Sequence, residues 1–139
     1  MLPLEPRQQK IYVTCLVEHN GHVLLLRGSQ YADRASFGSI GYFGLPRFTL
    51  RFGADPVKTI TRELQQQFGQ SVDTPSIVSV SERLSNRHTQ TVELVYRMSV
   101  PVPVAEQPGR YLFARRDQLE DYVLPSELEK LVTWLNRQG

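Results

Sequence analysis

Three polar residues near the middle of the chain have the spacing of a site for a divalent cation. Glu63, Gln66 and Gln67 follow one another at intervals that place them on one side of an α-helix. Carboxylates so arranged would offer the oxygen ligands that Mg²⁺ prefers beside phosphate groups. Glu63 is the only carboxylate of the three, and a glutamine carbonyl brings no charge. The spacing therefore predicts either a weak cation site or a solvated helix face.

The flanking residues predict the helix that would present this trio. Asp55 can cap the N-terminus, Pro56 suits the first turn, and Gly69 stands where a helix often ends. The apolar residues between these ends fall on one side, and they are Val57, Ile60, Leu64 and Phe68. We therefore expect a helix over residues 55–68 that buries this apolar side and turns the polar trio away from the core.

The remaining segments predict a mixed sheet around this helix. A β-hairpin is expected from strands at 11–17 and 23–27 joined by an Asn-Gly turn, and a long loop follows at 28–43. Further strands are expected at 48–52, 77–84, 91–100 and 111–113, with a helical turn at 117–122 and a final helix at 125–137. This order is not a regular alternation of strands and helices, so the fold class is α/β with a mixed sheet, of the α+β kind.

Length and composition limit the architecture and the class of partner. The 139 residues, 40% hydrophobic and 22% charged, suit a single domain over 1–139, with residues 1–9 as a flexible segment. A formal charge of +2 argues against a dedicated nucleic-acid binder. Cys15 is the only cysteine, so no internal disulfide can form. No apolar run is long enough to cross a membrane, and we expect a cytoplasmic protein.

The helix and the residues before it resemble a Nudix box, the motif of MutT-like proteins. The matching residues are Leu45-Pro46, Gly53, Pro56, Arg62-Glu63-Leu64 and Gly69. The box runs Gly, five residues, Glu, seven residues, Arg-Glu-aliphatic, one residue, Glu-Glu, one residue, Gly. With Arg62-Glu63 on its Arg-Glu, Phe48 replaces the first Gly and Ala54 the first Glu, and Gln66 and Gln67 replace the Glu pair. The order of elements over roughly residues 8–137 is also similar, which implies a Nudix-type α/β/α sandwich.

This resemblance implies hydrolysis of a nucleoside diphosphate linked to another group, with Mg²⁺ or Mn²⁺ bound by the box carboxylates. Transferred to this chain, Glu63 would be the main metal ligand or the catalytic base, Arg62 would orient it, and Gln66 and Gln67 would be weak metal ligands. The residues at positions 54, 66 and 67 remove negative charge from the box, so two functions remain open. One is a Nudix hydrolase with a depleted metal site and weak, altered or absent activity. The other is a non-catalytic binding or regulatory domain that needs no metal.

Residues outside the box could hold the ligand, which the resemblance implies is a small nucleotide-like molecule. Arg47 and Arg51 could bind phosphate through charge-assisted hydrogen bonds if they face the cleft. Glu82 or Glu93, on later strands, could supply an additional metal ligand or base. The other ligand-binding candidates are a strand-end arginine and a loop aromatic that could stack on a base, Arg27 and Phe43. Nudix proteins are often dimers, so a homodimer is a further expectation.

Overall fold

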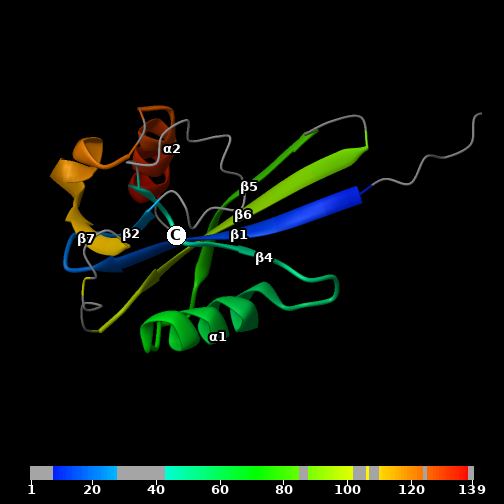
Figure 1. Ribbon diagram of the computed structural model, residues 1–139, viewed down its shortest axis with the longest axis horizontal. Helices are drawn as coiled ribbons and strands as arrows, with labels where there is room; N and C mark the ends of the chain where they lie inside the picture. Colours follow the sequence, from blue (N-terminus) through cyan, green and yellow to red (C-terminus); the bar gives the residue numbers. More distant parts are fainter. Residues whose placement is uncertain are drawn as a thin grey trace, which may run out of the picture.

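The chain folds around one mixed β-sheet (Figure 1). A computed structural model describes residues 8–27, 43–84, 88–101, 106, 110–123 and 125–137. The strands are β1 (Gln8–His19), β2 (His22–Arg27), β3 (Phe43–Gly44), β4 (Arg47–Thr49), β5 (Ser76–Leu84), β6 (Thr89–Ser99) and β7 (Tyr111–Arg115). The helices are α1 (Pro56–Phe68), α2 (Pro125–Asn136) and the short 3-10 helix η3 (Arg116–Asp121). The strand order is β3-β2-β1-β6-β5, with β4 paired to β1 and β7 to β2, so the mixed sheet expected from the sequence is confirmed.

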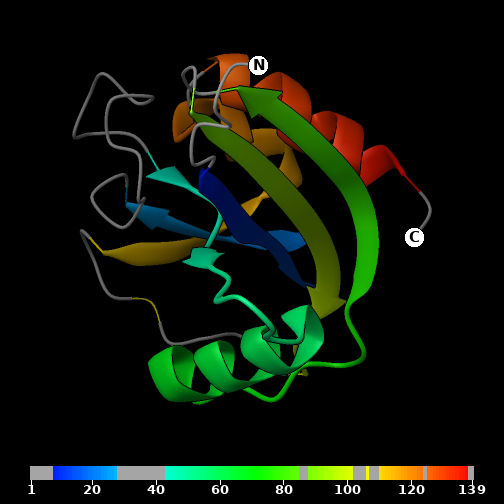
Figure 2. The same ribbon diagram turned by 90° about the vertical axis from the view of Figure 1, so that its right-hand side faces the viewer.

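Strand β1 lies at the centre of the sheet and separates two cores. It pairs in parallel with β6 and antiparallel with β2 and β4. Because side chains alternate along a strand, Val13, Cys15 and Val17 turn to the face covered by α1, whereas Leu16 turns to the face covered by α2. The two helices therefore lie on opposite faces of the sheet (Figure 2), which is the α/β/α sandwich expected from the sequence.

Helix α1 has the ends that its sequence predicts. The Asp55 side chain accepts a hydrogen bond from the Lys58 backbone N–H at 3.1 Å, and proline occupies the first turn. Gly69 ends the helix with a φ of 64°, in the left-handed region that glycine adopts without strain. Ile60 and Leu64 are fully buried and Phe68 packs against the same core, which confirms these residues of the predicted apolar side, whereas Val57 is half-buried and not part of that core.

Strands β1 and β4 differ most from the bounds predicted for them. Strand β1 begins at Gln8, where its pairing with Thr89 of β6 starts, and so it extends beyond both ends of the predicted strand at 11–17. Strand β4 is short because the chain leaves the sheet after it and makes a turn. In that turn the Ala54 backbone N–H donates to the Arg51 carbonyl at 3.0 Å. The predicted strand at 48–52 is therefore half strand and half turn.

Of the long loop predicted at 28–43, only the last residue lies among the described residues. Phe43, which the pattern places at the end of the loop, lies in β3 opposite Arg27 of β2. The remaining loop residues, 28–42, lie outside the described residues, as do most residues of the proline-rich segment before β7. Within the described ranges, no helix combines the length and the apolar character that a membrane crossing needs.

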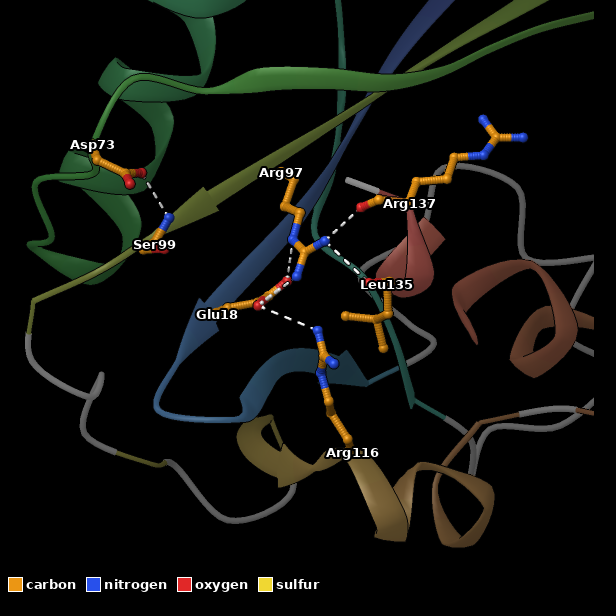
Figure 3. A network of polar contacts seen from close by, with 7 residues as sticks. All are labelled: Glu18, Asp73, Arg97, Ser99, Arg116, Leu135 and Arg137. Atoms are coloured by element: carbon orange, nitrogen blue, oxygen red, sulfur yellow. Dashed lines mark hydrogen bonds and ion pairs between the residues drawn. The ribbon is translucent and has the colours of Figure 1, made fainter. Parts of the chain in front are cut away.

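A network of polar contacts fixes the C-terminal end of α2 against the sheet (Figure 3). Arg97 of β6 donates through Nη1 to the carbonyl oxygens of Leu135 at 3.0 Å and Arg137 at 2.8 Å, at a helix end whose carbonyls lack helical partners. Its Nε and Nη2 lie 2.6 and 3.1 Å from the carboxylate of Glu18 in β1. Arg116 lies 3.6 Å from the same carboxylate. We refer to Glu18, Arg97 and Arg116 as the α2 clamp.

Candidate functional site

The polar side of α1 carries one carboxylate that already has protein partners. The Glu63 side chain is 27% exposed, and its Oε2 accepts a hydrogen bond from Gln67 Nε2 at 3.1 Å. The Arg62 guanidinium lies 3.9 Å from Glu63 Oε1. Gln66 and Gln67 are exposed. The helix therefore brings the predicted residues together on one side, but it turns an amide N–H donor, rather than an oxygen, toward Glu63.

The side chains on this side of α1 offer a divalent cation one carboxylate, that of Glu63. Proteins bind Mg²⁺ through oxygen ligands, commonly one or two carboxylates completed by waters and phosphates. Across the part of the chain that the structure describes, no three His, Cys, Asp or Glu side chains are placed to hold a metal ion together. Glu63 supplies a single charge, and the neighbouring Arg62 opposes the approach of a cation. Among the described residues, a cation at this position would therefore have Glu63 as its carboxylate ligand and would need its remaining ligands from water or from the phosphates of a ligand.

A pocket of about 410 Å³ lies on the other face of the sheet, against α2. Strands β1, β4, β5 and β6 form its floor, and α2 with the segment before it forms its wall. The charged side chains of the lining are three basic and three acidic residues, Arg47, Arg83, Lys130, Glu82, Glu93 and Glu127. No described residue of α1 belongs to the lining. The pocket and the box helix are therefore separate surfaces.

The register of three strands places the polar residues of the floor. Thr14 of β1 pairs with Arg47 of β4, so both side chains point to the same face of the sheet. Tyr12 of β1 pairs with Glu93 of β6, and Thr14 lies two positions further along β1, again on this face. The same alternation turns Leu16 into the α2 core. Residues that are distant in sequence therefore meet on the α2 face.

Arg47 and Glu93 form the charged centre of this floor. The Arg47 side chain is only 10% exposed, and its guanidinium carbon lies 4.1 Å from the centre of the Tyr12 ring, a cation–π contact. Glu93 Oε2 accepts a hydrogen bond from Thr14 Oγ1 at 2.7 Å. Arg47 Nε lies 3.8 Å from Glu93 Oε2, which is beyond hydrogen-bond distance. This Nε is buried and has no hydrogen-bond partner among the described residues.

Exposed charges and an aromatic ring border the same pocket. Lys130 of α2 is 57% exposed and lies 3.8 Å from Glu127, and Arg83 of β5 is also exposed. Trp134, the only tryptophan of the chain, is half-buried on α2 and lines the pocket. Leu131 adds a buried apolar surface on the same wall. The pocket therefore combines a polar floor, a partly apolar wall and basic groups at its exposed rim.

The structure brings only part of the predicted ligand-binding set to this pocket. Arg47 and Glu82 belong to the lining, whereas Arg51 is exposed outside it. Phe43 packs against the α2 core. Arg27 ends β2 and is not among the described lining residues. Arg47 lies in the pocket with Glu93 because its pairing with Thr14 turns its side chain to the α2 face.

Sequence patterns reveal little of the rest of the lining. Thr14 is the exception, because it is a polar residue inside an otherwise apolar strand segment, and this interruption is a usable signal. Lys130 and Trp134 lie on a helix whose apolar period predicts its buried side but not the sheet face that it covers. Their place in the pocket wall depends on tertiary packing and carries no local signal.

Comparison with known proteins identifies the fold. No protein-family model matches the sequence, and no curated protein is significantly similar to it. The solution structure of the E. coli ORF135 protein is similar with a TM-score of 0.67 at 14% identity, over 96% of this chain and 93% of that one. The crystal structure of a MutT Nudix hydrolase from Burkholderia pseudomallei is similar with a TM-score of 0.65 at 16% identity, over 91% of this chain and 98% of that one. The crystal structure of a mutator MutT protein from Bacillus halodurans has a TM-score of 0.68 at 16% identity, over 92% of this chain and 83% of that one. The chain therefore has a Nudix-type fold.

Proposed function

We propose that this chain is a Nudix-fold domain that binds a nucleotide-like phosphate ligand in the pocket between the sheet and α2, with weak or no hydrolysis of that ligand. One observation carries the proposal. A lined pocket is present on the α2 face, whereas the sequence of the box keeps Glu63 and has Ala54, Gln66 and Gln67 where the box has carboxylates. Ligand binding is therefore better supported than ligand hydrolysis in this chain.

The size and the lining of the pocket support a small phosphorylated ligand. Its volume of about 410 Å³ falls within the range of about 300–1,000 Å³ that is typical of small-molecule sites. Arg83 and Lys130 occupy exposed positions of the lining, where basic side chains can reach phosphate oxygens through charge-assisted hydrogen bonds. Leu131 and Trp134 supply apolar surface on which a planar ring can lie.

A residual hydrolase is the second candidate, and the exposure of Glu63 favours it. The Glu63 side chain is 27% exposed, so its carboxylate is accessible to a cation that arrives with the phosphates of a substrate. Hydrolysis by this route would require Mg²⁺ or Mn²⁺ and would be lost in Glu63→Gln. Ligand binding in the pocket requires neither the cation nor Glu63.

A titration with nucleoside diphosphates and nucleoside diphosphate sugars, in EDTA or in Mg²⁺, separates the two candidates. Trp134 fluorescence reports binding, because it is the only tryptophan and lines the pocket, and phosphate analysis reports hydrolysis. We expect binding in EDTA that Mg²⁺ changes by less than about twofold, without phosphate release above the blank. Release that requires both Mg²⁺ and Glu63 would support the hydrolase. An absence of binding across the panel would overturn the proposal.

Two substitutions locate the phosphate. Arg83→Gln and Lys130→Gln each remove a charge from the rim, and each should weaken binding by about three- to tenfold, because hydrogen bonds to phosphate from charged donors are the stronger kind. Arg115→Gln is the matched control, since Arg115 is exposed on β7 and is not a described lining residue. Equal effects of all three substitutions would indicate a general charge effect rather than a contact in the pocket.

A further inference from the structure

The floor of the pocket offers a hydrogen-bond donor and an acceptor close together. Arg47 Nε is buried and finds no hydrogen-bond partner among the described residues. Glu93 accepts a hydrogen bond from Thr14 at 2.7 Å, although an ionised carboxylate can accept about four. The Nε and the nearer carboxylate oxygen are 3.8 Å apart, and the two side chains are 10% and 22% exposed. Buried polar groups are normally paired, so Arg47 Nε is a donor that a ligand in the pocket could use.

This pair of side chains is poorly suited to a phosphate group. A phosphate placed on Arg47 Nε would also approach the Glu93 carboxylate, and repulsion between two negative charges is strong where water is excluded. At the rim, Lys130 also has an acidic neighbour at 3.8 Å, but both side chains are more exposed and water weakens the repulsion. The phosphate end of a ligand therefore belongs at the rim, and the floor suits an uncharged part.

We propose that Arg47 and Glu93 read the hydrogen-bonding edge of a neutral planar ring. In this arrangement Arg47 Nε donates to an acceptor on the ring, and Glu93 accepts from the N–H group beside it. Thr14 is a positioning residue, because its hydrogen bond orients the Glu93 carboxylate. The inference rests on the proposed function and specifies which end of the ligand enters first.

Two kinds of ring present the required edge. A lactam carries a carbonyl oxygen beside an N–H, as in uracil and guanine, and an aminated ring carries an amino group beside a ring nitrogen, as in cytosine and adenine. Both are neutral and planar, and both place a donor next to an acceptor. They are two sources of the same recognition chemistry, and the experiment below distinguishes them.

The protein holds the pair in place before a ligand arrives. The Tyr12 ring supports the guanidinium at 4.1 Å, and Thr14 fixes the carboxylate, while neither contact satisfies Arg47 Nε. All four side chains lie on paired strands of the sheet rather than on loops. Groups fixed in this way lose little freedom on binding, and a site built to bond a polar edge rejects analogues that lack it.

The unaltered full chain provides the first test. In EDTA, Trp134 fluorescence is titrated with the 5′-diphosphates of uridine, guanosine, cytidine and adenosine, and with ribose 5-phosphate, which has no ring edge. We expect the tightest nucleotide to bind at least about tenfold more tightly than ribose 5-phosphate. Methylation of the donor nitrogen of that nucleotide should remove most of the difference. The order within the panel shows whether the lactam or the aminated edge is preferred.

Substitution of Glu93 provides the second test. Glu93→Gln replaces an acceptor oxygen by an amide donor. It should lower the affinity for the tightest-binding nucleotide by at least about tenfold and leave the affinity for ribose 5-phosphate unchanged. Glu129→Gln makes the same chemical change on an exposed part of α2 that is not among the described lining residues, and should have no effect. Thermal unfolding followed by circular dichroism verifies that each variant is folded. If Glu93→Gln does not fold, the methylated nucleotide tests the same contact in the unaltered chain.

The outcomes separate this inference from the function on which it rests. Nucleotides and ribose 5-phosphate that bind equally, without sensitivity to ring methylation, would overturn ring recognition and leave phosphate binding in the pocket intact. Binding of none of these probes would overturn the proposed function itself. A loss of stability in Glu93→Gln with an unchanged preference among nucleotides would assign the pair a purely structural role.

Discussion

Arg47 acquires its place in the pocket from the direction in which a single side chain points. Its charge distinguishes it from neither Arg51 nor the other arginines of the chain. Antiparallel pairing with Thr14 turns it to the α2 face, whereas the next residue, Phe48, turns to the α1 core. A register shift of one residue would exchange the two side chains. The guanidinium group therefore determines which interactions Arg47 can make, and the register of β4 determines on which face of the sheet it makes them.

Restoring the missing charges on α1 tests the depleted metal site. The double substitution Gln66→Glu, Gln67→Glu places two carboxylates beside Glu63 and removes the amide that donates to it. We expect Mn²⁺ and Mg²⁺ affinity to rise by at least about tenfold in calorimetry, because carboxylates are the preferred ligands of these ions. Glu63→Gln in this background should abolish the gain. Gln65→Glu, Gln70→Glu adds the same charge elsewhere and should leave metal affinity low.

Cys15 tests the tightness of the core at the same scale. Its side chain is fully buried, and burial raises the pKa of the thiol far above its ordinary value. Because the thiolate is the reactive form, we expect the native chain at pH 8 to react with a thiol reagent at least about a hundredfold more slowly than the chain unfolded in guanidinium. Rapid labelling of the native chain would instead show that β1 opens locally.

Helix α1 illustrates what local signals determine at the scale of an element. Its beginning at Asp55, its end at Gly69 and its buried side all follow from residues within or next to the helix. Capping groups, glycine in a left-handed conformation and the helical period act over a few residues. The element is therefore defined by its own sequence, independently of the fold that receives it.

Removing the capping side chain should weaken α1 by a measurable amount. Asp55→Ala deletes the acceptor of the Lys58 backbone N–H and should lower the free energy of unfolding by about 1 kcal/mol. Asp55→Asn retains an acceptor oxygen and should recover most of this loss. Urea unfolding measures both differences. An alanine variant as stable as the unaltered chain would mean that water caps the helix equally well.

The fold was predictable from the sequence and the pocket was not, because local signals act over only a few residues. Strands, helices and their order follow from local patterns, and the bounds of α1 and of most strands agree with them. The pocket joins Thr14 to Glu93 across 79 positions of sequence. That meeting depends on the register between β1 and β6, which no local pattern determines. The early end of β4 has a similar origin, since the following turn, and not the strand composition, ends it.

At the scale of the whole molecule, α2 connects the proposed ligand pocket to contacts that hold the fold together. One side of the helix forms the pocket wall, and its C-terminal end is fixed by the α2 clamp. Arg137, just after the helix, donates to the Val78 carbonyl of β5 at 2.6 Å and ties the same end to another strand of the floor. The helix that forms the pocket wall is therefore held to the sheet by contacts that lie outside the pocket.

Breaking the α2 clamp should affect stability and the pocket together. Arg97→Gln removes hydrogen bonds to two carbonyls and to Glu18, and should lower the free energy of unfolding by about 2 kcal/mol. Ligand affinity measured through Trp134 should fall as well. Arg115→Gln breaks an ion pair with Asp117 whose side chains are 60% and 65% exposed, and should change stability by less than about 0.5 kcal/mol. A stable Arg97→Gln variant with normal affinity would exclude this coupling.

The alternation along β1 also lets the two sides of the molecule vary independently. Thr14 lines the pocket, while its neighbours Val13 and Cys15 belong to the core beneath α1. Strand β1 therefore contributes to both faces of the sheet and separates them. Exposed residues of α1 can be exchanged without altering any described residue that lines the pocket. The composition of the exposed side of α1 and that of the pocket lining are accordingly free to change without each other.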